Sequence, residues 1–198
     1  MAFSLAMTWS FFITTGVLAQ FTNLPDVPPG VFNVSSRLEI HHTNLSSAWG
    51  ALTDFPLYPT WNPFVRSSIV VSPANITLPN QRPVENTQLI LRVQIPPLPL
   101  PVNEYTPDDP LNTQVSYENV THVQPELGRL AWAFYFKEIL DAERWQALSD
   151  LGGGRVLYES CEVYRGPLAE LLRTTSGEGL QKAFDAQAQG LKLLLEGS

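Results

Sequence analysis

Cysteine is almost absent from this 198-residue chain, because Cys161 is the only one. A single thiol excludes an intramolecular disulfide and any zinc site built from several cysteines. Lysine is also scarce, with Lys137, Lys182 and Lys192 set against 19 acidic residues and a net charge of −7. Such a chain offers no basic stripe for phosphate groups, so nucleic acid is not an expected partner. We expect Cys161 to be a small buried side chain.

Sequence fingerprints of catalysis and cofactor binding are missing as well. The chain has no G-x-S-x-G, H-E-x-x-H, Walker or dinucleotide-binding pattern. His41 and His42 are adjacent, and adjacent side chains on a strand point to opposite faces of the sheet, so they do not predict a shared metal ion. We therefore expect no metal and no other cofactor.

The amino-terminal residues are apolar and uncharged. Residues 2–19 carry no charged side chain, and Val17 and Ala19 are small enough to precede a signal-peptidase cut before Gln20. We therefore expect residues 1–19 to be a signal peptide, 20–33 a proline-marked lead-in and 34–198 a single domain. No stable membrane insertion is expected once the leader is removed. The alternative is a cytoplasmic protein with an apolar leader.

Four N-x-[ST] triplets favour entry into the secretory pathway. The predicted glycosylation sites are Asn33, Asn44, Asn75 and Asn119. Asn75 lies in a stretch that is typical of a turn between strands, where a glycan has room.

Hydrophobic periodicity predicts one strand, a short helix, six further strands and a long helix. Alternation of apolar and polar residues marks strands at 31–40, 65–72, 87–95, 113–123, 128–136, 144–150 and 155–164. A short helix is expected over 44–54, capped by Asn44 or Ser46, and a long amphipathic helix over 167–197. No helix-length crossover separates consecutive strands of the run, so the sheet is expected to be antiparallel. Its apolar face must pack against the long helix, which defines an α+β fold.

The segment "DFPLYPTWNPFV" at 54–65 is unusual for a soluble protein. It is too rich in proline for a regular helix or strand, and too apolar for a solvated loop. We expect it to be a buried turn that closes one end of the core between sheet and helix. The residues predicted to hold this part of the structure are Trp49, Trp61, Asn62 and Pro63.

The segments "SSAWGALTDFPLYPTWNPFV", "GRLAWAFYF" and "YESCEVYRGPLAELL" resemble the START/Bet v 1-like (SRPBCC) superfamily. Within this superfamily, the chain is more closely similar to the polyketide cyclase/dehydrase and coenzyme Q-binding (COQ10-type) branch. The family's W-N-P turn corresponds to 61–63, and its entry into the last helix corresponds to Tyr164, Gly166 and Leu168. The resemblance covers about 34–196. It implies a helix-grip fold, with a curved antiparallel sheet of six to seven strands around the carboxy-terminal helix and a deep apolar cavity.

Two classes of function are consistent with such a cavity. The first is the binding or transport of a hydrophobic small molecule, namely a lipid, quinone, polyketide or terpenoid, within a pathway of secondary metabolite biosynthesis. The second is an enzyme that cyclises or isomerises such a compound with acid–base residues in the same cavity. The missing catalytic fingerprints favour binding.

Two apolar stripes are expected to line the cavity. The strand stripe consists of Leu130, Trp132, Phe134 and Phe136, and the helix stripe consists of Leu180, Phe184, Gln187 and Leu191. Each face of strand 155–164 carries one glutamate, so polarity alone does not decide which face points inward. The resemblance favours the face of Tyr158 and Glu162, which makes these two the candidate catalytic residues. The alternative is that Glu162 faces solvent.

The run "PPLPLPVNEYTPDDP" at 96–110 contains six prolines. A stiff connection at the cavity mouth is the favoured interpretation, with Leu100 and Tyr105 able to cover a ligand. The alternative is a polyproline ligand for a partner domain.

Overall fold

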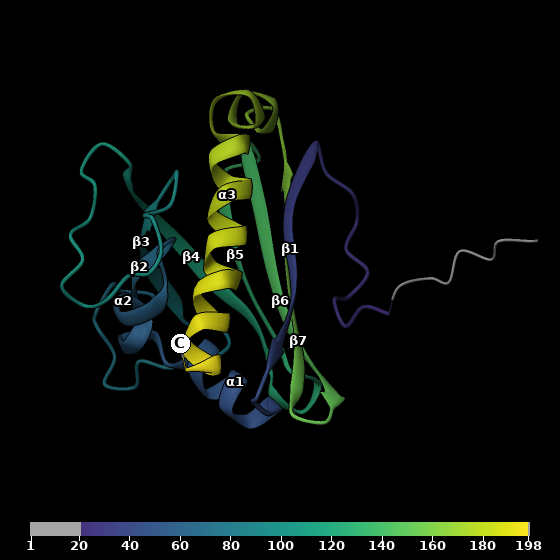
Figure 1. The fold of residues 1–198 in the computed structure, drawn as a ribbon. Coiled ribbons are helices and arrows are strands. Elements are labelled where there is room, and N and C mark those ends of the chain that lie inside the picture. The colour runs from purple at the N-terminus through teal and green to yellow at the C-terminus, as the bar shows by residue number, and fades with distance from the viewer. Residues whose placement is uncertain (1–20, 198) are drawn as a thin grey trace, which may run out of the picture.

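A computed structural model describes residues 21–197, so the predicted signal peptide lies outside the described residues. Seven strands form one antiparallel sheet in the order β1-β7-β6-β5-β4-β3-β2, which curves around one long helix (Figure 1). The strands are β1 (Phe32–His41), β2 (Val65–Val71), β3 (Gln88–Gln94), β4 (Thr113–Gln124), β5 (Arg129–Phe136), β6 (Leu140–Gly152) and β7 (Arg155–Arg165). The predicted α+β fold with a helix gripped by a curved sheet is confirmed.

The helices take up little of the chain apart from the last one. They are α1 (Leu45–Thr53), the 3₁₀ turn η1 (Phe55–Leu57), α2 (Tyr58–Trp61), the 3₁₀ turn η2 (Pro125–Leu127) and α3 (Ala169–Glu196). Asn44 caps α1, since its side-chain oxygen accepts a hydrogen bond from the Ser47 amide at 2.9 Å. Within residues 21–197, no helix is both long enough and apolar enough to cross a membrane.

Local irregularities account for the curvature of the sheet. The register shifts at three places: between Val65 and Ser67, between Val120 and His122, and between Asp150 and Gly152. An extra residue on one strand bends that strand and increases its twist. The sheet can therefore fold around α3 instead of lying flat beside it.

Strand β6 is longer than the sequence predicted, because it begins at Leu140 and not at 144. Leu140 pairs with Phe136 across a tight turn in which Lys137 and Glu138 both adopt positive φ angles. The turn therefore leaves no loop between β5 and β6. Residues 140–143 continue the register of the β5–β6 hairpin. Apolar and polar residues alternate only weakly there, so the sequence did not predict this part of the strand.

The segment at 54–65 contains two short helical turns, η1 and α2, where the sequence predicted neither helix nor strand. Pro56 and Pro59 lie in the first turns of these elements, where an amide hydrogen is not needed for the helix. The Asn62 side-chain oxygen then accepts hydrogen bonds from the amides of Phe64 (3.0 Å) and Val65 (2.9 Å). These bonds lead the chain directly from α2 into β2.

This turn lies directly against the long helix. Trp61 is 3% exposed, and its ring meets the Tyr58 ring edge-on with the centroids 5.0 Å apart. A Cβ atom at Gly190 would lie 2.3 Å from the Trp61 carbonyl oxygen. Only glycine therefore allows α3 to approach the turn this closely, and the turn closes one end of the core.

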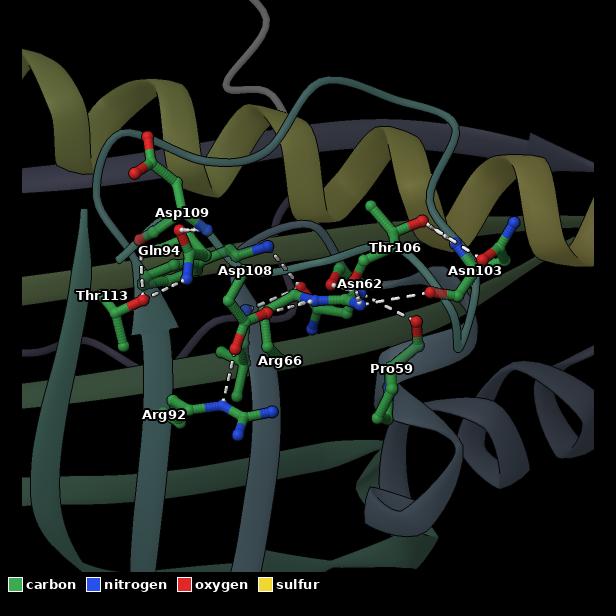
Figure 2. A network of polar contacts seen from close by, with 12 residues as sticks. Pro59, Asn62, Arg66, Arg92, Gln94, Asn103, Thr106, Asp108, Asp109 and Thr113 are labelled. Carbon is green, nitrogen blue, oxygen red and sulfur yellow. Dashed lines mark hydrogen bonds and ion pairs between the residues drawn. The ribbon is translucent and has the colours of Figure 1, made fainter. Parts of the chain in front are cut away.

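The proline-rich loop at 96–110 is fixed by Arg66, a buried side chain of β2 (Figure 2). Its Nε atom donates to Asp108, and its two terminal nitrogens donate to backbone carbonyls of the turn and the loop. The four carbonyls belong to Pro59, Asn62, Asn103 and Thr106. All donor groups of the guanidinium are thereby used to hold the loop against the turn.

The structure also shows how exposed the predicted glycosylation sites and Cys161 are. The four asparagines of the N-x-[ST] triplets are all exposed, and Asn75 lies in a turn with a φ angle of 58°. Their glycosylation stays a prediction. Cys161 is half-buried on the convex face of β7, where the sequence predicted a buried side chain.

Replacing Trp61 with alanine is expected to lower the free energy of unfolding by about 3–5 kcal/mol, as for other buried aromatic truncations. The reason is the loss of packing between the turn and α3. Chemical unfolding of the purified variant measures the effect. Tyr105→Ala is the control, because Tyr105 is 84% exposed. Unfolding of Trp61→Ala at the wild-type denaturant concentration would show that the turn does not support the fold.

Candidate functional site

A cavity of about 240 Å³ lies between the concave face of the sheet and the first half of α3. Most of its wall is apolar, formed by Phe64, Val65, Leu91, Val93, Ile95, Val115, Trp132, Phe134, Leu140, Ala142, Leu172 and Leu180. Its polar lining consists of Gln114, Ser116, Glu118, Arg144, Glu162, Tyr164 and Ser176. A concave apolar site with a few convergent polar groups is typical of small-molecule binding.

The second half of α3 packs tightly against the sheet below this cavity. Gln187 of α3 is fully buried and accepts a hydrogen bond from Arg144 Nη2 at 3.1 Å. Its amide nitrogen donates to Gln146 Oε1 at 2.9 Å and to the Tyr158 hydroxyl at 3.3 Å. The Tyr158 hydroxyl in turn donates to Gln146 Oε1 at 2.7 Å. These buried groups form a connected network that joins the helix to β6 and β7.

Arg144 lies at the boundary between this network and the cavity. It is 2% exposed, and its guanidinium carbon is 4.1 Å from the ring centroid of Phe184, 5.2 Å from that of Phe64 and 5.6 Å from that of Trp132. Its Nε atom donates to the Ser160 hydroxyl at 3.3 Å. Aromatic faces and two neutral oxygens therefore contact this cation, and Glu162 is its register partner on β7. No carboxylate within residues 21–197 forms an ion pair with it.

Glu118 of β4 lines the cavity on the same face of the sheet, two strands away from Arg144 of β6. Desolvation, followed by the charge of Glu162, raises its pKa to about 8, while the Ser116 hydroxyl and Arg144 act against the shift. The Ser116 hydroxyl donates a hydrogen bond to the carboxyl group. Glu118 is therefore mainly protonated at neutral pH.

Glu162 of β7 is the second carboxyl group in the cavity wall. Burial in the apolar wall raises its pKa, while Arg144 and the Tyr164 hydroxyl oppose the rise. Burial and the neighbouring Glu162 raise the pKa of Tyr164 well above its ordinary value, so that this phenol is neutral. The cavity thus combines two carboxyl groups, a phenol and a guanidinium, a set that can transfer protons.

The structure brings four of the predicted site residues into the cavity wall: Trp132, Phe134, Leu180 and Glu162. Leu130, Phe184, Gln187 and Leu191 are buried in the packed core below it. Tyr158 belongs to the hydrogen-bond network and does not line the cavity. The inward face of β7 carries Tyr158 and Glu162, while Glu159 on the outward face bonds to Arg37.

Three expectations for the cavity lining need correction. Phe136 was expected to line the cavity, but it is 47% exposed, because it lies at the end of the β5–β6 hairpin, beyond Ala133, where the pairing of β5 with β4 stops. Leu100 and Tyr105 were expected to cover a ligand at the cavity mouth. Tyr105 is exposed, and Leu100 borders a separate hollow beside Trp61 and Gly190, so the proline-rich loop contributes no lining residue.

The sequence analysis did not identify Arg144 and Glu118. Arg144 is the first residue of the strand predicted at 144–150. A charged side chain at the end of a strand is normally exposed to solvent. Glu118 alternates with Ser116 and Val120, and Arg144 alternates with Gln146 and Leu148. This shared alternation with apolar or amide side chains is the only signal that could have placed them inward.

With the fold and site described, the chain can be compared with known proteins. No protein-family model matches the sequence, and no curated protein matches it. Among solved structures, a hypothetical protein of Helicobacter pylori aligns with a TM-score of 0.64 and 14% identity over 89% of this chain and 99% of that chain. The di-domain ARO/CYC protein BexL of the BE-7585A biosynthetic pathway aligns with a TM-score of 0.50 and 6% identity, over 80% of this chain and 47% of BexL.

A START superfamily protein of Mycobacterium smegmatis also matches, with a TM-score of 0.49, 19% identity and coverage of 80% of this chain and 98% of that chain. The sheet order, the long carboxy-terminal helix and the likeness to the first two structures define a helix-grip fold. The predicted helix-grip fold is thereby confirmed. The narrower similarity to the coenzyme Q-binding branch stays a prediction.

The raised pKa of Glu118 predicts a pH-dependent stability. In the folded state, Glu118 keeps its proton up to about pH 8. In the unfolded chain, where the carboxyl pKa is about 4.5, Glu118 loses this proton at a lower pH. The free energy of unfolding should therefore fall as pH rises from about 5 to 8. Glu118→Gln removes the titrating proton. At pH 9 the free energy of unfolding of the variant should therefore be higher than that of the wild type by about 2–5 kcal/mol.

Urea unfolding at pH 5, 7 and 9 measures the difference. At pH 5 the variant and the wild type should be about equally stable. Glu126→Gln is the control, because Glu126 is exposed in η2. If Glu118→Gln and the wild type lose stability in parallel over this range, Glu118 is not protonated in the folded state.

Proposed function

We propose that this protein binds a hydrophobic small molecule, such as a lipid, quinone, polyketide or terpenoid, in the cavity between the sheet and the first half of α3. The observation that carries this proposal is the composition of the wall, in which apolar side chains surround a small set of inward polar groups. Filling such a cavity removes apolar surface from water at about 25 cal/mol per Å². The polar groups then fix the orientation of the ligand.

The arrangement of α3 supports this proposal. The second half of the helix is held to the sheet by Gln187 and to the turn at 54–65 by the close approach at Gly190. Leu172, Ser176 and Leu180, nearer its amino terminus, instead border the cavity. The cavity thus lies beside the amino-terminal half of the helix, away from these two contacts.

Phe134→Asp tests the proposal. Phe134 is half-buried in the cavity wall, so the variant should fold, but its carboxylate would have to be desolvated by a bound apolar molecule. The affinity for the fluorescent probe N-phenyl-1-naphthylamine should fall more than about tenfold. Native mass spectrometry of the wild type should also detect a co-purifying small molecule that Phe134→Asp has lost.

Tyr135→Asp is the matched control, because Tyr135 is the next residue of β5 and faces outward, with 60% exposure. It should bind the probe like the wild type. Equal probe affinities for Phe134→Asp and the wild type would exclude this cavity as the binding site.

The alternative function is an enzyme that cyclises or isomerises such a molecule. The specific observation in its favour is that Glu118 and Glu162, both with raised pKa values, line one apolar cavity together with Tyr164. A protonated carboxyl group beside a substrate can act as a general acid, and its conjugate base can then accept a proton. The fold is also that of BexL, an ARO/CYC protein of a biosynthetic pathway.

Glu162→Gln separates the two functions, because it keeps the side-chain shape and removes the titrating proton. A carrier should bind the molecule identified by mass spectrometry within about threefold of the wild-type affinity. An enzyme that uses Glu162 should still bind that molecule but should convert it about 100-fold more slowly or worse. Glu143→Gln, on the outward face of β6, is the control. Unchanged turnover in Glu162→Gln would remove Glu162 from any catalytic role.

A further inference from the structure

The cavity contains one permanent cation. Among its lining residues, Arg144 is the only basic side chain, and Glu118 and Glu162 are the only acidic ones. The Nε and Nη2 atoms of Arg144 are occupied by Ser160 and Gln187. The Nη1 atom donates to no acceptor within residues 21–197, although the side chain lines the cavity. The guanidinium thus holds an unused pair of N–H donors at the wall.

A buried cation without an ion-pair partner is costly. Glu162 is the register partner of Arg144 on β7, but burial raises the pKa of its carboxyl group and the two form no ion pair. Removal from water penalises a charge unless an opposite charge or hydrogen bonds replace the lost hydration. Part of the lost hydration of Arg144 is replaced by two neutral oxygens and by the rings of Phe64, Trp132 and Phe184. The contrast with Arg66 is direct, because Arg66 is equally buried but pairs with Asp108 and uses all its donors. Arg66 therefore holds the turn and the proline-rich loop together, whereas the Nη1 donors of Arg144 stay available for a ligand.

We propose that the cavity selects apolar carboxylic acids and binds them as carboxylates, with the acid group at Nη1 of Arg144 and the apolar body along the wall toward Leu172 and Leu180. This inference rests on the proposed function and specifies its ligand class. A carboxylate at Nη1 makes a charge-assisted hydrogen bond, about twice as strong as a neutral one. It also forms an ion pair at contact distance, which no carboxylate within residues 21–197 forms with Arg144.

The acidic groups of the cavity are compatible with an anionic ligand. Glu118 has a pKa of about 8 and is mainly uncharged at pH 7, and burial moves Glu162 in the same direction. Tyr164 is neutral, and Ser116 and Ser176 are uncharged. A protonated carboxyl group can donate a hydrogen bond to a bound carboxylate instead of repelling it. Arg144 stays charged at neutral pH, so the cavity offers one permanent cation to a bound carboxylate.

A displacement experiment with a matched pair of ligands tests this inference. N-phenyl-1-naphthylamine is neutral and apolar, and its fluorescence reports occupation of the cavity. Decanoic acid and 1-decanol, which have the same chain length, compete with it at pH 7 against the wild type, Arg144→Met and Arg155→Met. Arg155 is the control because it is an exposed arginine that does not line the cavity. Arg144→Met removes the charge and keeps an unbranched apolar side chain.

For the wild type and Arg155→Met, decanoic acid should displace the probe at a concentration at least about tenfold lower than 1-decanol. In Arg144→Met, the affinity for decanoic acid should fall roughly 10- to 100-fold, the range for one hydrogen bond to a charged group. The affinity for 1-decanol should change less than about threefold. A variant that loses both competitors equally would show that Arg144 only shapes the cavity, which overturns the inference.

The wild-type comparison keeps the inference testable if Arg144→Met does not fold. Equal displacement by the two competitors, stronger displacement by 1-decanol, or no displacement by either would each overturn it. In all three cases the bound probe still supports the proposed function. If the probe itself does not bind the wild type, the proposed function fails together with the inference.

Discussion

The contact between Gln187 and the centre of the sheet is the constraint on which the rest of the structure depends. Gln187 lies in the middle of the amphipathic helix, at a position where an apolar residue would be ordinary, yet it is fully buried. It accepts a hydrogen bond from Arg144 and donates to Gln146 and Tyr158. Because a buried amide must find its partners, only one rotation and one height of α3 over the sheet satisfy all of them. The network thereby fixes where the packed core ends and the cavity begins.

The buried turn at 54–65 constrains the same helix at a second point. Gly190 is three residues after Gln187, and it allows the Trp61 carbonyl to approach the helix backbone. Arg66 then ties the turn to the proline-rich loop, so that three segments far apart in the sequence support each other (Figure 2). With its second half held at two places, α3 leaves its first half free to form a wall of the cavity. The proposed ligand site therefore lies beside the half of α3 that these two contacts do not hold.

Much of the fold could be predicted from the sequence, because strands alternate at a period of two and the long helix follows its own period. The inward position of Trp132 and Phe134 on β5 followed from that alternation, whereas the exposure of Phe136 did not. The strand continues with the same pattern beyond Ala133, where its pairing with β4 ends, and only the three-dimensional arrangement shows this. The two prolines at 56 and 59 misled the prediction for the opposite reason. They suggested a broken chain, but at the first turn of a helix proline loses no hydrogen bond.

The polar part of the site was less predictable, since a charged residue in a strand is normally on the solvated face. Arg144 faces inward because aromatic rings, one hydroxyl oxygen and one amide oxygen contact its guanidinium group. No local sequence pattern predicts such partners. Its charge also has a sign opposite to that of the whole chain, which is −7. At physiological ionic strength the field of surface charges decays within about 8–10 Å. The acidic surface therefore gives an approaching anion no long-range attraction, and any preference for acids must arise at contact, inside the low-dielectric cavity where Arg144 acts most strongly.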